Sequence, residues 1–375
     1  MLHVMRARSE FGLFKRRING RIVYYYYIWD ESNRRVYRST GERQKCRALD
    51  YVMSMRDKGL LGTRDRCMIS LRDYVRDFYI PDKCPIVKNA RMHGKSISRG
   101  TCATRRRALS LHVLPHLGHL PLWSITSARV NQWLLDLPST DKASRTSANA
   151  YFDALKQVLD QAVRDGLIPD NPCEKMERLG TDSVRREAFT TEEVRKIIGK
   201  PCDWDNFLIR TMCLTAALTG MRIGEIRALR PDAVTDTAIY VRASFSDNDG
   251  FKAPKNGKAR VAPIPAALRD QLRLLFPSDG GYIFRMVGDK PISSQYVLTK
   301  LKKRMAVVGI SGKTFHSFRA YFNTEMMSAN VNETVVRAVI GHQSADMTEH
   351  YLHLEAGEFS QIRKVQESIL RELLV

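Results

Sequence analysis

The stretch Thr219-Gly-Met-Arg-Ile-Gly-Glu225 decides how the second half of this 375-residue chain is interpreted. It lies in a helical pattern, so Arg222 and Glu225, at positions i and i+3, are expected on one helix face. An Arg-x-x-Glu pair by itself is most often an ion pair on the protein surface. The stretch therefore indicates a functional site only together with the motifs that follow it.

Two of the following motifs carry basic residues. Lys255-Asn-Gly-Lys258 places a lysine just before a tight-turn dipeptide, between two strand-like runs. Thr314-Phe-His-Ser-Phe-Arg319 is expected to open a helix capped by Thr314, with His316 and Arg319 pointing the same way. Taken alone, the first is most often a plain hairpin turn and the second a solvated helix face.

The last motif combines a histidine with a tyrosine. Gly341-His342 is followed by Thr348-Glu-His-Tyr351-Leu-His353. Alone, this pattern is also typical of a capped helix with a core aromatic residue. The order and spacing of all four motifs within one predicted domain favour a shared site.

Together the motifs resemble the Arg, Lys, His-x-x-Arg, His and Tyr signature of tyrosine recombinases of the phage-integrase type, the lambda-integrase-like site-specific recombinases. The resemblance covers about Arg185 to Val375. It extends more weakly to residues 112–121, which are similar to a stretch of integrase core-binding domains, and to residues 1–66, which are similar to an arm-binding domain. Met221 and Ile340 stand where leucine is commoner, and neither touches the chemistry.

The resemblance implies an integrase that cleaves and rejoins DNA through a 3′-phosphotyrosyl intermediate, to integrate and excise a prophage or other mobile element. The candidate catalytic residues are Arg222, Lys255, His316, Arg319, His342 and Tyr351. Tyr351 would be the nucleophile, with His316 as the candidate acceptor of its proton. Lys255 is the candidate general acid for the leaving 5′-oxygen. Glu225 is expected to buttress Arg222.

The chemistry needs positive groups around the phosphate, because negative charge on the phosphoryl oxygens must be offset in the transition state. The sequence contains no carboxylate cluster that would hold metal ions for this purpose, and no phosphate-binding P-loop. Arg222 and Arg319 would form a clamp on the phosphate, since arginine grips two oxygens and stays charged. His342 would donate a further hydrogen bond. We expect no cofactor and no metal.

The expected fold class is multidomain and mainly α. Residues 1–66 are predicted to form a small basic β-sheet with one helix, residues 67–178 a helical, SAM-like core-binding domain, and residues 179–375 a mixed α+β catalytic domain. In the first part, Arg21–Trp29 and residues 35–40 are predicted strands, followed by a helix over residues 43–58. By resemblance, the three parts are the arm-type DNA-binding domain, the core-binding domain and the recombinase domain.

Further elements are predicted along the rest of the chain. Residues 147–165 have the period of a long helix, and the region from Ala238 to Pro265 that of a hairpin. Thr190 and Glu193 form a capping-box pattern at the start of the last domain. The amphipathic tail, Phe359 to Leu374, is expected to dock on a neighbouring protomer.

The charge of the chain points to a polyanionic partner. The sequence holds 61 Lys+Arg against 40 Asp+Glu, a formal net charge of +21, which favours nucleic acid over a solvated basic surface or a membrane surface. The segment from Lys83 to Arg107 has no acidic residue and is interpreted as a basic loop. The DNA-binding candidates in it are Lys95, Arg99, Arg105, Arg106 and Arg107.

Cysteine usage and hydropathy indicate a cytoplasmic protein, and the resemblance to phage integrases implies a bacterial host. Seven cysteines at scattered spacings, without a Cys-x-x-Cys pair, fit reduced thiols and no zinc site, and no run of 18 apolar residues predicts a membrane span. His112 and His116 have metal-ligand spacing, but Pro115 and Gly118 are expected to break the helix that this spacing requires. A packing or DNA-backbone role is therefore expected for the two histidines.

The implied partners are double-stranded DNA with specific attachment sites and three further copies of the chain, in a homotetramer on DNA. An excisionase and a DNA-bending host protein are further partners that such an integrase could use. Two alternatives stay open at this point: a DNA-binding relative that has lost catalysis, and a type IB topoisomerase or telomere resolvase with the same chemistry.

Overall fold

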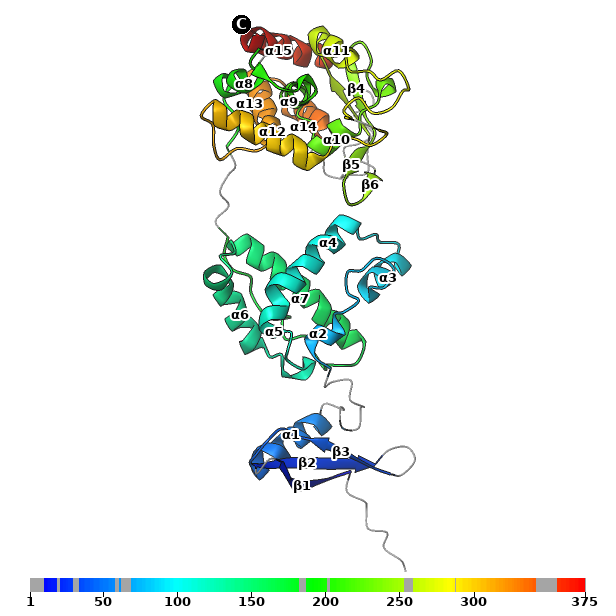
Figure 1. Ribbon diagram of the computed structural model, residues 1–375, viewed down its shortest axis with the longest axis vertical. Helices are drawn as coiled ribbons and strands as arrows, with labels where there is room; N and C mark the ends of the chain where they lie inside the picture. Colours follow the sequence, from blue (N-terminus) through cyan, green and yellow to red (C-terminus); the bar gives the residue numbers. More distant parts are fainter. Residues whose placement is uncertain are drawn as a thin grey trace, which may run out of the picture. The chain divides into compact units, whose positions relative to one another are not determined.

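The computed structural model of the full chain describes residues 10–18, 21–29, 34–57, 61, 69–181, 187–200, 203–252, 259–286, 288–341 and 356–374. Contacts divide the chain into two compact units, Met1–Asp182 and Ser183–Val375. Both units are rich in helices and hold only small sheets, which confirms the mainly α fold class (Figure 1). No helix in the described ranges is both long and apolar enough to cross a lipid bilayer.

The first unit begins with a three-stranded antiparallel sheet in the order β1-β2-β3. Its elements are β1 (Phe11–Ile18), β2 (Arg21–Trp29), β3 (Arg35–Ser39) and the helix α1 (Lys45–Asp57). Ile18 pairs with Arg21, so β1 and β2 are antiparallel neighbours along the whole length of β1. Tyr26 and Ile28 alternate along β2 and are buried in one small cluster with Val52 of α1. The predicted sheet with one helix is confirmed.

The rest of the first unit is helical. Its elements are α2 (Leu71–Tyr74), α3 (Pro85–Met92), α4 (Arg99–Ala108), a π-helical turn (Leu109–Val113), α5 (Leu114–Leu117), a 3₁₀ turn (Leu122–Ser124), α6 (Ser127–Thr140) and α7 (Arg145–Arg164). The long helix predicted over residues 147–165 is α7, and its Phe152, Leu155 and Val158 lie in the core.

The prediction of a basic loop from Lys83 to Arg107 is wrong, because most of this segment is helical. Pro85 occupies the first turn of α3, where a missing N–H costs nothing. Ser98 caps α4 by accepting a hydrogen bond from the backbone N–H of Thr101 at 3.1 Å. These local start signals outweigh the absence of a strong apolar period.

The expected break of the helix around Pro115 is also wrong. A π-helical turn precedes Pro115 and continues directly into α5, so the chain stays helical. His112 Nδ1 lies 2.6 Å from Asp141 Oδ2, and His116 Nε2 lies 3.4 Å from Asp141 Oδ1. The His112 ring also stacks on Tyr151 at 4.0 Å between ring centroids. Both histidines thus serve the packing of α5, α6 and α7.

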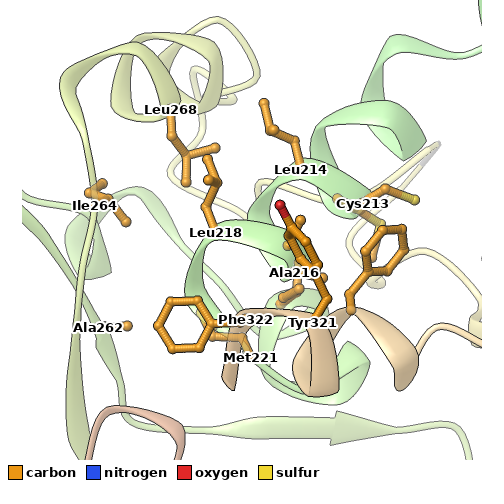
Figure 2. Packing of buried hydrophobic residues seen from close by; sticks show 14 of the residues in the cluster. Cys213, Leu214, Ala216, Leu218, Met221, Ala262, Ile264, Leu268, Tyr321 and Phe322 are labelled. Carbon is orange, nitrogen blue, oxygen red and sulfur yellow. The ribbon is translucent and has the colours of Figure 1, made fainter. Parts of the chain in front are cut away.

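The second unit is built around one helix, α9, that is buried over most of its length. Its helices are α8 (Thr191–Ile198), α9 (Phe207–Thr219), α10 (Ile223–Arg227), a 3₁₀ turn (Pro231–Ala233), α11 (Ala266–Arg273), α12 (Ser294–Val307), α13 (Ser317–Ser328), α14 (Glu333–Ile340) and α15 (Ala356–Leu374). Every residue of α9 from Ile209 to Thr219 is buried, so this helix is the centre of the core. Figure 2 shows Cys213, Leu214 and Leu218 of α9 beside Tyr321 and Phe322 of α13.

The hairpin region predicted from Ala238 to Pro265 contains two small antiparallel sheets. Strand β4 (Ala238–Val241) pairs with β7 (Arg260–Pro263), and β5 (Ser244–Ser246) pairs with β6 (Gly250–Lys252). The predicted capping box at the start of α8 is confirmed, since the Thr190 and Glu193 side chains each bind the other residue's backbone N–H. Strand β7 carries Arg260, which contacts Glu225 of α10 and Val339 of α14.

Helix α15 packs on its own unit, where it contacts α8, α13 and β7. Its apolar face, with Ile362, Ile369, Leu370 and Leu373, belongs to the main core of the unit. The amphipathic pattern of the tail is thus confirmed as a helix, but its apolar face is already covered within one chain. Docking on a neighbouring protomer is not needed to bury it.

Candidate active site

A sharp turn between α9 and α10 positions Arg222. Gly220 ends α9 in the left-handed conformation, with φ of 63°. A Cβ atom there would lie 2.8 Å from Phe322 Cδ1 and 3.0 Å from Ile340 Cγ2, so the close packing also requires glycine. Arg222 then takes the N-cap position of α10 in an extended conformation. The prediction that Arg222 and Glu225 share one helix face is corrected: they are the cap and third residue of α10.

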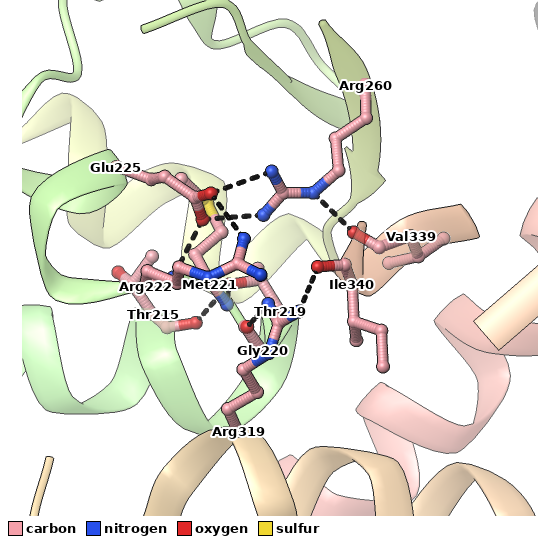
Figure 3. Close-up of polar contacts among 10 residues, drawn as sticks. All are labelled: Thr215, Thr219, Gly220, Met221, Arg222, Glu225, Arg260, Arg319, Val339 and Ile340. Atoms are coloured by element: carbon pink, nitrogen blue, oxygen red, sulfur yellow. Dashed lines mark hydrogen bonds and ion pairs between the residues drawn. The ribbon is translucent and has the colours of Figure 1, made fainter. Parts of the chain in front are cut away.

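Glu225 lies at the centre of the site as a buried carboxylate, with 1% of its side chain exposed. Its Oε2 accepts the backbone N–H of Arg222 at 2.8 Å, and its Oε1 lies 3.0 Å from Arg222 Nη1. Arg260 binds the same carboxylate in a bidentate way, at 2.9 Å and 2.6 Å (Figure 3). Burial raises the pKa of Glu225, but the Arg260 and Arg222 contacts outweigh it and hold the pKa below its usual range.

Arg319 enters the site from α13 and is almost fully buried. Its Nη1 donates to the carbonyl oxygen of Gly220 at 2.8 Å, and its Nη2 donates to the carbonyl oxygen of Ile340 (Figure 3). Burial, followed by the neighbouring charges of Arg222 and Arg260, lowers the pKa of Arg319 to about 9. The guanidinium is therefore still charged at neutral pH. A bound anion would offset its repulsion by Arg222 and Arg260.

Three guanidinium groups thus converge around one carboxylate. Arg260 Nε also donates to the carbonyl oxygen of Val339 at 2.7 Å, which ties β7 to the end of α14. The Arg222 side chain is the most exposed of the three arginines, at 26%, against 9% for Arg260. The group is held from behind by Glu225 and carbonyl oxygens and keeps an excess of positive charge. Such an arrangement is suited to bind a phosphate.

His316 lies at the N-cap of α13, one turn before Arg319, and its side chain is exposed. Thr314 is not the cap that the sequence predicted; its backbone N–H donates to the Ser317 hydroxyl at 3.2 Å, and the helix begins at Ser317. The short His-x-x-Arg spacing therefore joins an exposed imidazole to a buried guanidinium at the start of one helix.

Lys255, His342 and Tyr351 lie outside the residues that the structure describes. The structure does describe the residues that flank the segments holding Lys255 and His342. Residue 252 ends β6, and β7 resumes at Arg260, the partner of Glu225. Gly341, with φ of 72°, ends α14, and a Cβ atom there would lie 3.2 Å from Arg260 Cδ. The segments that hold Lys255 and His342 therefore both join the described chain beside Arg260.

Arg260 is the residue of this site that the sequence analysis missed. It follows the Lys-Asn-Gly-Lys motif in the sequence and opens a short strand, and nothing in that pattern separates it from the many other arginines of the chain. Its partner Glu225 lies 35 positions earlier in the chain. A correlation between residue types at positions 225 and 260 among related sequences could have identified Arg260.

The DNA-binding candidates of the first unit lie on helix α4 and just before it. Arg105, Arg106 and Arg107 are in the last turn of α4, and Arg99 is in its first. Arg106, Arg107, Lys95 and Arg99 are exposed, whereas Arg105 is half-buried with its guanidinium 5.7 Å from the centre of the Tyr79 ring. Four of the five are thus accessible to a phosphate backbone, and Arg105 also takes part in packing.

The sequence signature of the phage integrase family matches residues 187–358. A tyrosine recombinase of Thermosipho africanus is 24% identical over 226 residues, 59% of this chain and 76% of the relative. The integrase of Mycobacterium phage L5 is 24% identical over 255 residues, 64% of this chain and 66% of that protein. A lambda integrase tetramer bound to a Holliday junction matches in fold with a TM-score of 0.59 at 18% identity, covering 89% of this chain and 96% of that one.

Proposed function

We propose that this chain, whose residues 187–358 match the phage integrase family, is a tyrosine recombinase that cleaves and rejoins DNA at specific sites through a phosphotyrosyl link to Tyr351. Members of this family are enzymes of DNA strand breakage and rejoining. The observation that carries the proposal is the convergence of Arg222, Arg260 and Arg319 around Glu225, which gathers positive charge in one place.

The three arginines support phosphate chemistry because hydrogen bonds hold their side chains in place. Glu225 and the carbonyl oxygens of Gly220 and Ile340 hold the guanidinium groups, so little reorganisation is needed when negative charge develops. We assign the clamp on the scissile phosphate to Arg222 and Arg319. A phosphate would also favour the charged form of Arg319, whose pKa is lowered by burial and then by its cationic neighbours.

The proposed cleavage step is a displacement at phosphorus. The phenol oxygen of Tyr351 forms a bond to phosphorus while the bond from phosphorus to the 5′-oxygen breaks. His316 accepts the phenol proton, Lys255 protonates the departing 5′-oxygen, and His342 donates to a non-bridging oxygen. The link to the 3′-phosphate keeps the free energy of the phosphodiester, so the reverse attack by a 5′-hydroxyl reseals the strand without a nucleotide. In this scheme arginines supply the positive charge, and the reaction needs no metal.

We further propose a division of labour along the chain. Residues 1–66 bind arm-type sites, residues 67–178 bind the core site through Lys95, Arg99 and the basic end of α4, and residues 179–375 carry out catalysis. The tetramer of lambda integrase on a Holliday junction supports a homotetramer of this chain on DNA. The reaction would integrate and excise a prophage or other mobile element, with an excisionase and a DNA-bending host protein as further partners.

A trapped covalent adduct tests the proposed chemistry. The substrate is a nicked duplex spanning the attachment site, which is recovered by sequencing the DNA on both sides of the gene. The nick releases a short strand after cleavage, so the enzyme stays attached to DNA. We expect an adduct with the unaltered chain and none with Tyr351→Phe, whereas the control Tyr240→Phe, an exposed residue of β4, should react normally. Adduct formation by Tyr351→Phe would refute the assignment.

The requirement for two sites separates a recombinase from a topoisomerase with the same chemistry. Strand exchange should occur only between two DNA molecules that both carry the attachment site. Relaxation of a supercoiled plasmid without that site would favour the topoisomerase instead.

A further inference from the structure

Gln366 of α15 is a buried polar residue in an otherwise apolar interface. Its side chain has no exposed surface, and its neighbours along the helix face, Ile362, Ile369 and Leu370, belong to the core. A buried amide in such a place is costly unless its polar atoms find partners. The partners of Gln366 therefore indicate why the helix carries an amide there.

The amide nitrogen of Gln366 joins two elements of the candidate site. Nε2 donates to the carbonyl oxygen of Leu218 at 2.7 Å and to that of Pro263 at 2.8 Å. Leu218 lies in the last turn of α9, just before Gly220 and Arg222. Pro263 ends β7, the strand that opens with Arg260. Both protons of one amide are thus used, and its Oε1 is buried without a hydrogen-bond partner among the described residues.

The Leu218 carbonyl has lost its helical partner because of the site itself. In a continuing helix it would accept the backbone N–H of Arg222, four residues later. That N–H instead donates to Glu225 Oε2, as part of the turn that positions the Arg222 side chain. The amide of Gln366 donates to the Leu218 carbonyl oxygen in place of the Arg222 N–H. One residue of α15 is therefore bonded to the turn that positions Arg222.

We propose that Gln366 is a positioning residue. Through it, phosphate binding by the arginines depends on α15 being packed against α9 and β7. Loss of the amide leaves two buried carbonyl oxygens without a donor, at the ends of the elements that carry Arg222 and Arg260. The Gly220 carbonyl, which accepts from Arg319, follows in the same turn. Arg222 and Arg260 are therefore attached to backbone that Gln366 bonds directly, and Arg319 donates to a carbonyl of the same turn.

The first test compares two variants of the full chain that keep the shape of the side chain. Gln366→Met removes both donors, and Gln366→Glu replaces the donor by an acceptor at neutral pH. Ile362→Val is the matched control, since it is equally buried on the same helix but makes no polar contact. On the nicked attachment-site duplex, we expect both Gln366 variants to cleave on the order of 10- to 100-fold more slowly, by analogy with outer partners of other sites. Their DNA affinity should stay within about threefold, because phosphate contacts elsewhere dominate it.

A neutral substrate shows whether the effect passes through the arginines. When a methyl group replaces one non-bridging oxygen of the scissile phosphate, less charge remains for the guanidinium groups to offset. The deficit of the Gln366 variants should shrink on this substrate. An unchanged deficit, or an equal deficit in Ile362→Val, would mean that Gln366 only stabilises the fold and would overturn the inference.

This inference rests on the proposed cleavage reaction, and a second measurement separates the two. Hydrogen exchange of the backbone from residue 219 to residue 226 needs no reaction. It should become faster in Gln366→Met and Gln366→Glu but not in Ile362→Val. Unchanged exchange in the Gln366 variants would overturn the inference, whether or not the enzyme reacts. An unaltered chain that forms no adduct, with exchange faster as expected, would instead overturn the proposed function alone.

Discussion

Replacing Glu225 by glutamine removes the one negative charge among three guanidinium groups while keeping the volume of the side chain. The carboxylate accepts the backbone N–H of Arg222 and three hydrogen bonds from the guanidinium groups of Arg222 and Arg260. In the variant, the amide NH₂ group must face a guanidinium donor. Removing one partner of a buried ion pair costs about 3–5 kcal/mol. Because packing is unchanged, we expect Glu225→Gln to lower the free energy of unfolding by about 3 kcal/mol at pH 7.

The pH dependence gives this prediction a second, independent check. The pKa of Glu225 is lower in the folded protein than the value of about 4.3 in an unfolded chain. Its charge therefore stabilises the fold fully above that unfolded value, and the contribution is lost as the pH falls through the lower folded pKa. The difference between the unaltered chain and Glu225→Gln should be largest at pH 7 and should narrow below about pH 4.

Urea-dependent hydrogen exchange of peptides from α9 and α13 measures the free energy of unfolding of this unit within the full chain. Glu333→Gln is the control, since the ion pair of Glu333 with Arg337 on α14 is more than half exposed on both sides. It should change the free energy of unfolding far less. A cost for Glu225→Gln below about 1 kcal/mol at pH 7, the size of one ordinary hydrogen bond, would refute the reasoning. So would a difference that does not narrow in acid.

Two further predictions concern the turn and the DNA contacts. Gly220→Ala should destabilise the chain by about 1–3 kcal/mol in thermal unfolding, because φ is 63° and the added methyl group meets Phe322 and Ile340. Gly309→Ala, with φ of 72° and open space around it, should cost less, and equal costs would show that crowding plays no part. Arg106→Gln should reduce the slope of log K against log salt for DNA binding by about 0.9, the loss of one phosphate contact. An unchanged slope between 50 and 200 mM salt would remove Arg106 from the interface.

Several features follow from the sequence because their causes are local. The Thr190–Glu193 capping box needs only two side chains within one turn, and both of its hydrogen bonds are present. The strand β2 runs over Arg21–Trp29, as its β-branched and aromatic residues predict. The length of α7 follows from its apolar period and from Ser144, which caps it. The helices in residues 83–107 and the helical segment through Pro115 are exceptions. A π-helical turn precedes Pro115, so the proline does not break the helix there.

The sequence by itself indicated the resemblance to tyrosine recombinases, the mainly α fold class and the set of candidate residues, because the motifs are short and their order can be read along the chain. Only the tertiary structure decided how the arginines are held. Arg260 and Glu225 are 35 positions apart, and Gln366 and Leu218 are 148 apart. A buried carboxylate or amide takes its partners from whatever segments the core brings beside it, and no local period encodes that choice. The turn at Gly220, which sends the N–H of Arg222 to Glu225 and leaves a carbonyl for Gln366, arises from the same packing.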